Sequence, residues 1–127
     1  MSGRHASLAV AMEFTYRREG SKSFLETVEA VERSVRAHGF VVLRRHDLQS
    51  TLASKGFTIQ PLMILDVAHE DQNADLCKLH IYADRGAVWV IAIRPNALVE
   101  DGAHKARGAA ELEANLTALV DSAISSG

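Results

Sequence analysis

A helix that ends at Gly39 and passes directly into a strand is the feature that most limits the folds open to this chain. Ser23 and Glu26 form a capping box, in which the serine oxygen accepts an early backbone N–H and the glutamate reaches back to the cap. Gly39 stands where a left-handed residue is expected after a helix. The apolar stripe between them consists of Phe24, Val28, Val31 and Val35. The outer face carries acid-before-base pairs four residues apart, Glu29–Arg33 and Glu32–Arg36.

Five segments have the composition of strands. They are residues 8–17, which Gly20 then breaks, and residues 40–45, 62–67, 77–83 and 87–93. The first and fourth alternate apolar and polar residues, which predicts one buried and one exposed face. The last is apolar throughout, so we expect it to be central and covered on both faces, with Trp89 in the core. The short turn Asp84–Gly86 predicts that the last two strands form a hairpin.

Two further helices complete the predicted order of elements. Asp47 is placed to cap a short helix that Gly56 closes, and a last helix spans about residues 104–124. The order is β-α-β-(short α)-β-β-β-α over a single domain, residues 1–127. We therefore predict an α+β fold, a mostly antiparallel sheet with helices on one face. The pattern leaves open whether the first two strands are neighbours.

Composition narrows the class of protein. The 127 residues carry a formal net charge of −2 with no single-sign block, which argues against extensive nucleic-acid binding. One cysteine, Cys77, cannot form an internal disulfide, so nothing indicates an oxidising compartment. No stretch approaches the roughly 20 apolar residues that span a bilayer. We expect a cytoplasmic protein without membrane contacts.

A distributed pattern of residues resembles a known family. The matching residues are Ser23-Phe24, Glu26-Thr27-Val28, Gly39-Phe40, His46-Asp47-Leu48-Gln49, Thr51-Leu52, Lys55-Gly56, Pro61, Ile64-Leu65 and the strand that begins at Cys77. In this order they are similar to the bacterial and archaeal domain-of-unknown-function 302 family, over about residues 8–95. The resemblance implies a TATA-binding-protein-like fold and homodimers. It implies no biochemical activity.

The connection between the third and fourth strands departs from that family pattern. Relatives usually have an Asn-Pro and a helix there, with a proline before the cysteine. This chain has the short acidic stretch Glu70 to Asp75, and Leu76 stands in the place of the proline.

Cys77 is the residue with the richest chemistry. His69, Cys77 and His80 are suitable zinc ligand types, but residues three apart on a strand point to opposite faces, so no metal site is predicted. Cys77 shares its face with apolar residues, which favours a packing role. The alternative is a reactive thiol in a small redox or sensing protein, which requires a lowered thiol pKa.

Two acidic positions have competing interpretations. His46-Asp47 has the residue types of a general base and its orienting carboxylate, but adjacent side chains rarely face each other, so an N-cap role for Asp47 is favoured. Asp66 lies in an apolar strand, on the face of Leu62 and Ile64. Edge exposure, pairing with an arginine and catalysis explain it equally well.

Basic side chains recur on or beside the strands, at Arg17, Arg44, Arg45, Lys78 and Arg94. If several meet on one open face with His80 and Tyr82, that face could hold an anion, a nucleotide or nucleic acid. The competing interpretation is a solvated face whose charges protect strand edges. The residues we single out as candidate ligand-binding residues are Arg44, Lys78, His80 and Tyr82.

The sequence contains no glycine-rich phosphate loop, nucleophile-elbow motif or HExxH. We therefore predict a non-enzymatic, homodimeric ligand-binding or regulatory protein without a cofactor or metal, which binds a small anion. The first alternative is a redox or sensing protein centred on Cys77. The second is nucleic-acid binding on the polar sheet face, which the net charge disfavours.

Overall fold

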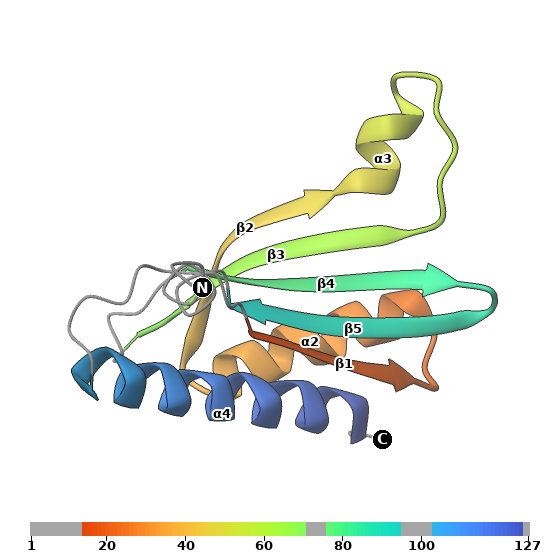
Figure 1. Cartoon of the computed structure of the whole chain (residues 1–127). Helices are drawn as coiled ribbons and strands as arrows, with labels where there is room; N and C mark the ends of the chain where they lie inside the picture. Colours follow the sequence, from red (N-terminus) through yellow and green to blue (C-terminus); the bar gives the residue numbers. More distant parts are fainter. Residues whose placement is uncertain (1–13, 71–75, 95–102, 126–127) are drawn as a thin grey trace, which may run out of the picture.

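The computed structural model describes residues 14–70, 76–94 and 103–125 as one five-stranded sheet with two long helices on one of its faces (Figure 1). The elements are β1 (Phe14–Gly20), α2 (Phe24–Ala37), β2 (Phe40–Asp47), α3 (Leu48–Ala53), β3 (Leu62–His69), β4 (Cys77–Asp84), β5 (Ala87–Arg94) and α4 (Ala103–Ser125). The strand order is β1-β5-β4-β3-β2 and every pair is antiparallel. The predicted fold class and order of elements are confirmed.

Helix α2 begins and ends as its sequence predicts. The Ser23 Oγ accepts the Glu26 N–H at 3.2 Å, and the Glu26 carboxylate accepts the Ser23 N–H at 3.2 Å. Gly39 has φ +81°, the left-handed value that favours glycine. The predicted pair between Glu32 and Arg36 is not the one that forms. The Glu32 carboxylate instead accepts a hydrogen bond from Arg45 of β2 at 2.7 Å.

The core lies between α2, α4 and the face of the sheet that they cover. Its fully buried side chains include Val31, Val35, Leu65, Leu79, Ile81, Val90, Leu116, Leu119 and Val120. The buried Ser34 hydroxyl donates to the Leu119 carbonyl at 2.7 Å and so links the two helices. None of the helices in the described residues is long and apolar enough to cross a membrane.

Hydrogen bonds connect the edge strand β1 and the residues after it to α4. Asp121 accepts hydrogen bonds from the Tyr16 hydroxyl at 2.6 Å and from Arg18 at 2.7 Å. Lys22 donates to the Ala123 and Ile124 carbonyls near the end of α4, at 3.0 and 3.2 Å, where a cation is favourable. The alternation of the first strand was predicted to be broken at Gly20, and β1 ends at Gly20; residues 8–13 lie outside the described part of the chain.

A one-residue irregularity in β2 redirects the side chains that follow it. Val42 pairs with Val67 but Arg44 pairs with Asp66, so Leu43 has no partner in β3. Before Leu43, the even-numbered side chains of β2 face the helices. After it, Arg44 and His46 lie on the opposite face of the sheet and Arg45 lies on the helix side.

Candidate functional site

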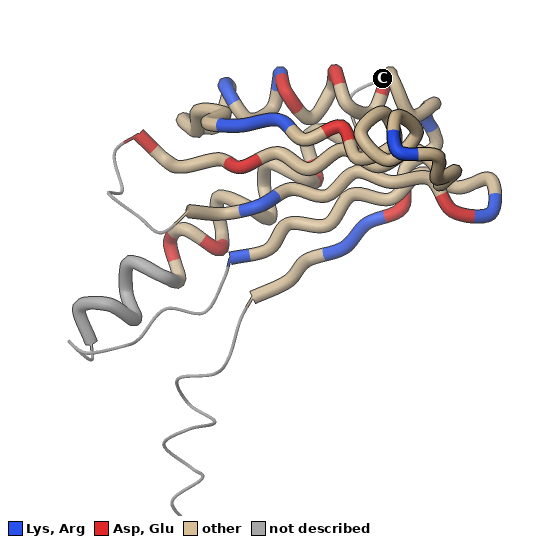
Figure 2. The backbone as a smooth tube through the Cα atoms, turned by 90° about the horizontal axis from the view of Figure 1, so that it is seen from above, with Lys and Arg blue, Asp and Glu red and all other residues tan. Residues whose placement is uncertain are grey.

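The candidate site is the face of the sheet that α2 and α4 leave uncovered, which we call the open face. Strand alternation and the pairing register arrange its side chains in three rows across the strands. The rows are Glu19–Trp89–Tyr82–Leu62, then Arg17–Ile91–His80–Ile64–His46, then Thr15–Ile93–Lys78–Asp66–Arg44. Figure 2 shows basic and acidic positions interspersed over the strands and helices. The open face thus combines aromatic, aliphatic and charged groups.

Asp66 is the anchor of the third row. It is only 7% exposed, and its carboxylate accepts hydrogen bonds from Lys78 at 2.7 Å and contacts His46 Nε2 at 3.1 Å. The hydrogen bond from Lys78, followed by that from His46, lowers the pKa of Asp66 below its ordinary value, although burial opposes the shift. Of the interpretations open for Asp66, pairing is the observed one, and the partners are a lysine and a histidine.

We expect Asp66 to make the protein less stable in acid. Because its pKa is lowered on folding, the ionised group stabilises the native state above the ordinary aspartate pKa of about 3.9, and this contribution disappears as pH falls through the native value. In Asp66→Asn, urea denaturation should show a loss of stability on acidification about 1 kcal/mol smaller than in wild type. The exposed Asp84→Asn is the control. Equal acid sensitivity in Asp66→Asn and wild type would contradict this assignment.

His80 lies at the centre of the open face, between Ile91 and Ile64 of the middle row. Burial, and secondarily the charge of Lys78, lower the pKa of His80 below its ordinary value. The ring is therefore neutral at pH 7. Its Nε2 is buried, and it has no hydrogen-bond partner among the described residues. A buried nitrogen of this kind normally has a partner. Because Nε2 has almost no accessible surface, a molecule on the open face can bond it only if the ring turns.

Trp89 and Tyr82 are neighbouring aromatic residues in the first row. They face each other across β5 and β4, and the Arg17 guanidinium lies 4.6 Å from the Trp89 ring centroid. The prediction that Trp89 belongs to the core is wrong, because β5 is covered by helices on one face only and Trp89 lies on the other. The central strand is β4. Continuous hydrophobicity in β5 reflects an apolar open face instead of a second covering layer.

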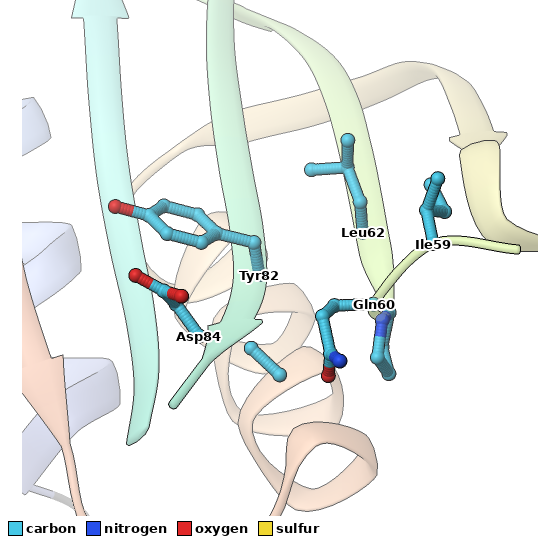
Figure 3. Close-up of a pocket in the computed structure, with 7 residues that line it drawn as sticks. Ile59, Gln60, Leu62, Tyr82 and Asp84 are labelled. Atoms are coloured by element: carbon cyan, nitrogen blue, oxygen red, sulfur yellow. The ribbon is translucent and has the colours of Figure 1, made fainter. Parts of the chain in front are cut away.

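A shallow groove of about 480 Å³ continues the first row past Tyr82. Figure 3 shows Leu62 and Tyr82 beside the segment that leads into β3. The lining residues are Ile59, Gln60, Pro61, Leu62, Tyr82, Ala83 and Asp84. We call it the Tyr82 groove. Its volume lies within the usual range for small-molecule sites, and its lining is mostly apolar.

The structure divides the five basic residues singled out in the sequence. Arg17, Arg44 and Lys78 lie on the open face. Arg45 bonds Glu32 of α2, and Arg94 bonds Glu113 of α4 at 2.6 and 2.8 Å. All four candidate ligand-binding residues, Arg44, Lys78, His80 and Tyr82, share the open face.

Cys77 and His80 lie on opposite faces of β4, as their spacing predicts. The Cys77 thiol is 0% exposed within the core. His69 packs edge-on against Phe40 with ring centroids 4.8 Å apart. Within the described ranges, no group of three His, Cys, Asp or Glu residues is arranged to hold a metal ion.

Asp47 is the N-cap of α3, which is the role that the sequence favoured for it. It accepts the Ser50 N–H at 3.0 Å at the start of α3. His46 turns away from it towards Asp66. The grouping of His46, Asp66 and Lys78, and the contact of Arg17 with Trp89, were missed in the sequence. Only the strand pairing could have revealed them.

Sequence comparison assigns the chain to a family. The sequence model for "Domain of unknown function DUF302" matches residues 15–123. The chain belongs to the DUF302 family. The match includes most of α4 and so extends beyond the residues 8–95 on which the resemblance was noted. The predicted acidic connection largely falls in residues 71–75, outside the described chain.

A solved DUF302 structure has the same fold. It is described as "Crystal structure of uncharacterized conserved protein DUF302 from Bacillus stearothermophilus". It superposes with a TM-score of 0.71 at 23% sequence identity, over 87% of this chain and 98% of that one. No curated protein matches the chain.

Proposed function

We propose that this DUF302 protein is a non-enzymatic homodimer that binds a small anionic ligand on the open face of its sheet. The observation that supports this most directly is that the four candidate residues share this face, with His80 at its centre. Arg44, Lys78 and Tyr82 surround it in the neighbouring rows. Arg17 and Trp89 extend the same surface towards β1.

The charges on the open face favour an anion. Lys78 is already compensated by Asp66, so its ammonium adds little net charge. Arg44 is exposed and Arg17 contacts the uncharged Trp89 ring, and neither guanidinium forms an ion pair with a carboxylate among the described residues. A guanidinium suits carboxylate, sulfonate or phosphate groups because its N–H groups form a planar fork.

The uncharged groups of the face favour a ligand with a flat or apolar body. Trp89, Tyr82 and the isoleucines of the middle row supply apolar contact area beside the two arginines. Neutral His80 offers one ring nitrogen as a donor or acceptor in these surroundings. Small-molecule sites commonly combine mostly apolar walls with a few such polar groups.

Binding of 1-anilinonaphthalene-8-sulfonate, an aromatic sulfonate, tests this proposal. Trp89 is the sole tryptophan, so its fluorescence should change as the probe binds. We expect Arg17→Ala and Tyr82→Ala each to weaken binding about fivefold or more, which corresponds to about 1 kcal/mol. Arg33→Ala removes an exposed arginine from α2, on the helix side, and is the matched control.

Equal weakening by Arg33→Ala would show that the probe senses net charge alone. Saturation of the probe signal without any effect of the open-face variants would place binding elsewhere and contradict the proposal. Circular dichroism on each variant confirms that the fold is retained, because this probe also binds partly unfolded proteins.

Single-stranded nucleic acid is a second candidate ligand, favoured by the contact of Arg17 with Trp89 and by Tyr82 in the same row. Aromatic rings on a sheet with nearby cations are typical of surfaces on which bases stack. The net charge of −2 weighs against it. An oligothymidylate titrated in place of the probe distinguishes the two, because no quenching of Trp89 at low salt excludes stacking on this face.

A further inference from the structure

Helix α3 and the residues after it form a projection at one end of the sheet, which we call the arm, residues 48–58 (Figure 1). The arm is shaped by its own polar contacts. Asp47 caps α3, Gly56 turns the chain with φ +90°, and the Phe57 N–H donates to the Leu52 carbonyl at 2.9 Å. No residue of α3 is buried. A six-residue helix without a buried face gains little stability from its own hydrogen bonds.

Large apolar side chains lie uncovered on and beside the arm. Phe57 is 60% exposed and Leu43, in the irregularity of β2, is 58% exposed. Leu48 and Leu52 of α3 are only partly covered. Exposed large apolar side chains on a projecting segment are one mark of a surface that contacts another protein.

The same chain also has an apolar groove of a kind that accepts such a side chain. The Tyr82 groove lies at the base of the arm, and Phe57 is not among the residues that line it. Phe57 and the groove therefore remain unused within one chain. A twofold axis would allow two copies to exchange both contacts at once, because an isologous interface uses the same patch on each subunit.

Charge complementarity supports a second copy as the occupant. Lys55 precedes Phe57 by two residues and is exposed. Asp84 is exposed and lines the groove. With Phe57 of one copy in the groove of the other, Lys55 would lie near the carboxylate of Asp84. Arg85 follows Asp84 but does not line the groove.

We propose that Phe57 of each subunit docks in the Tyr82 groove of the other, so that the arms form the dimer interface. This inference rests on the homodimer of the proposed function and names its contact surface. Two phenylalanine rings bury about 300–500 Å² in total. A stable interface needs at least about 1,200 Å², so Leu43, Leu48 and Leu52 must be covered as well.

This arrangement also bears on the open face, because Tyr82 belongs both to the groove and to the first row of the candidate site. The partner's Phe57 would close the apolar end of that row. The ligand would then lie against a wall that a single chain lacks.

Sedimentation velocity over a range of protein concentrations tests the interface. We expect a wild-type dimer and, for Phe57→Asp, a dissociation constant about 30-fold higher or more, as for an aromatic hot-spot residue. Leu25→Asp is the matched control, because Leu25 is 71% exposed on α2 and far from the arm in sequence. It should leave the dimer unchanged.

Charge exchange gives a second readout that does not depend on Phe57. Lys55→Asp and Asp84→Lys should each weaken the dimer, and the double variant should recover much of the loss. A Phe57→Asp dimer as tight as wild type would overturn the interface while leaving the homodimer and the ligand site standing. A monomeric wild type at all concentrations would remove both homodimer and interface, whereas the probe titration tests ligand binding separately.

Discussion

Cys77 in the folded protein should react with a thiol reagent at least about a thousandfold more slowly than in the unfolded chain. The thiol is 0% exposed between the sheet and the helices, so a reagent can reach it only when the core opens. For stable domains the unfolded fraction is about 10⁻³ or smaller. The measurement is the rate of disulfide exchange with 5,5′-dithiobis(2-nitrobenzoate), with and without denaturant.

Ser21→Cys supplies the control for this experiment. Ser21 is exposed, so an added thiol there should react quickly in the same folded molecule and show that the reagent is active. Fast, stoichiometric reaction of Cys77 under native conditions would contradict our expectation and favour the redox or sensing alternative. Slow reaction would indicate that Cys77 serves only in packing. The open face would then be the surface on which to test for function.

Gly39→Ala should destabilise the protein by about 2–3 kcal/mol. Part of the loss, about 1–2 kcal/mol, comes from placing an L side chain in the left-handed region at φ +81°. The rest has a specific neighbour, because a Cβ on Gly39 would lie 2.9 Å from His69 Nε2. His69 packs against Phe40, so its ring can move only by disturbing the core edge. Urea denaturation gives the free energy of unfolding.

Gly56→Ala separates the two contributions. Gly56 has φ +90°, yet a Cβ there meets nothing within 4 Å, so this variant should show the conformational cost alone. Adding His69→Ala to Gly39→Ala should recover part of the extra loss. Equal losses of unfolding free energy in Gly39→Ala and Gly56→Ala would show that the close approach of His69 does not contribute to the destabilisation.

Local signals in the sequence were sufficient for the helices. The capping box, the valine stripe and Gly39 each act within a few residues, and each is found in α2 as predicted. The Asp47 cap of α3 was predictable for the same reason. Element order and fold class followed from periodicity, because the covered face of a sheet needs apolar residues at every second position.

The candidate site was less predictable because it depends on contacts between strands. The unpaired Leu43 moves Arg44 and His46 to the open face, and nothing in the residues around it indicates the irregularity. Trp89 was misplaced because an apolar run has the same pattern whether its second face meets a helix or an open surface. The network around Asp66 requires the register of β2, β3 and β4, which periodicity alone does not determine.

The contacts between β1 and α4 affect the order in which the protein can fold. Tyr16 and Asp121 are 105 residues apart, and β1 also pairs with β5, at Phe14 and Arg94. Contacts of such large sequence separation slow folding, because a long loop must close before they form. During synthesis on a ribosome, β1 therefore lacks its partner strand until residues 87–94 have been made, and it lacks Asp121 until nearly the whole described chain has been made.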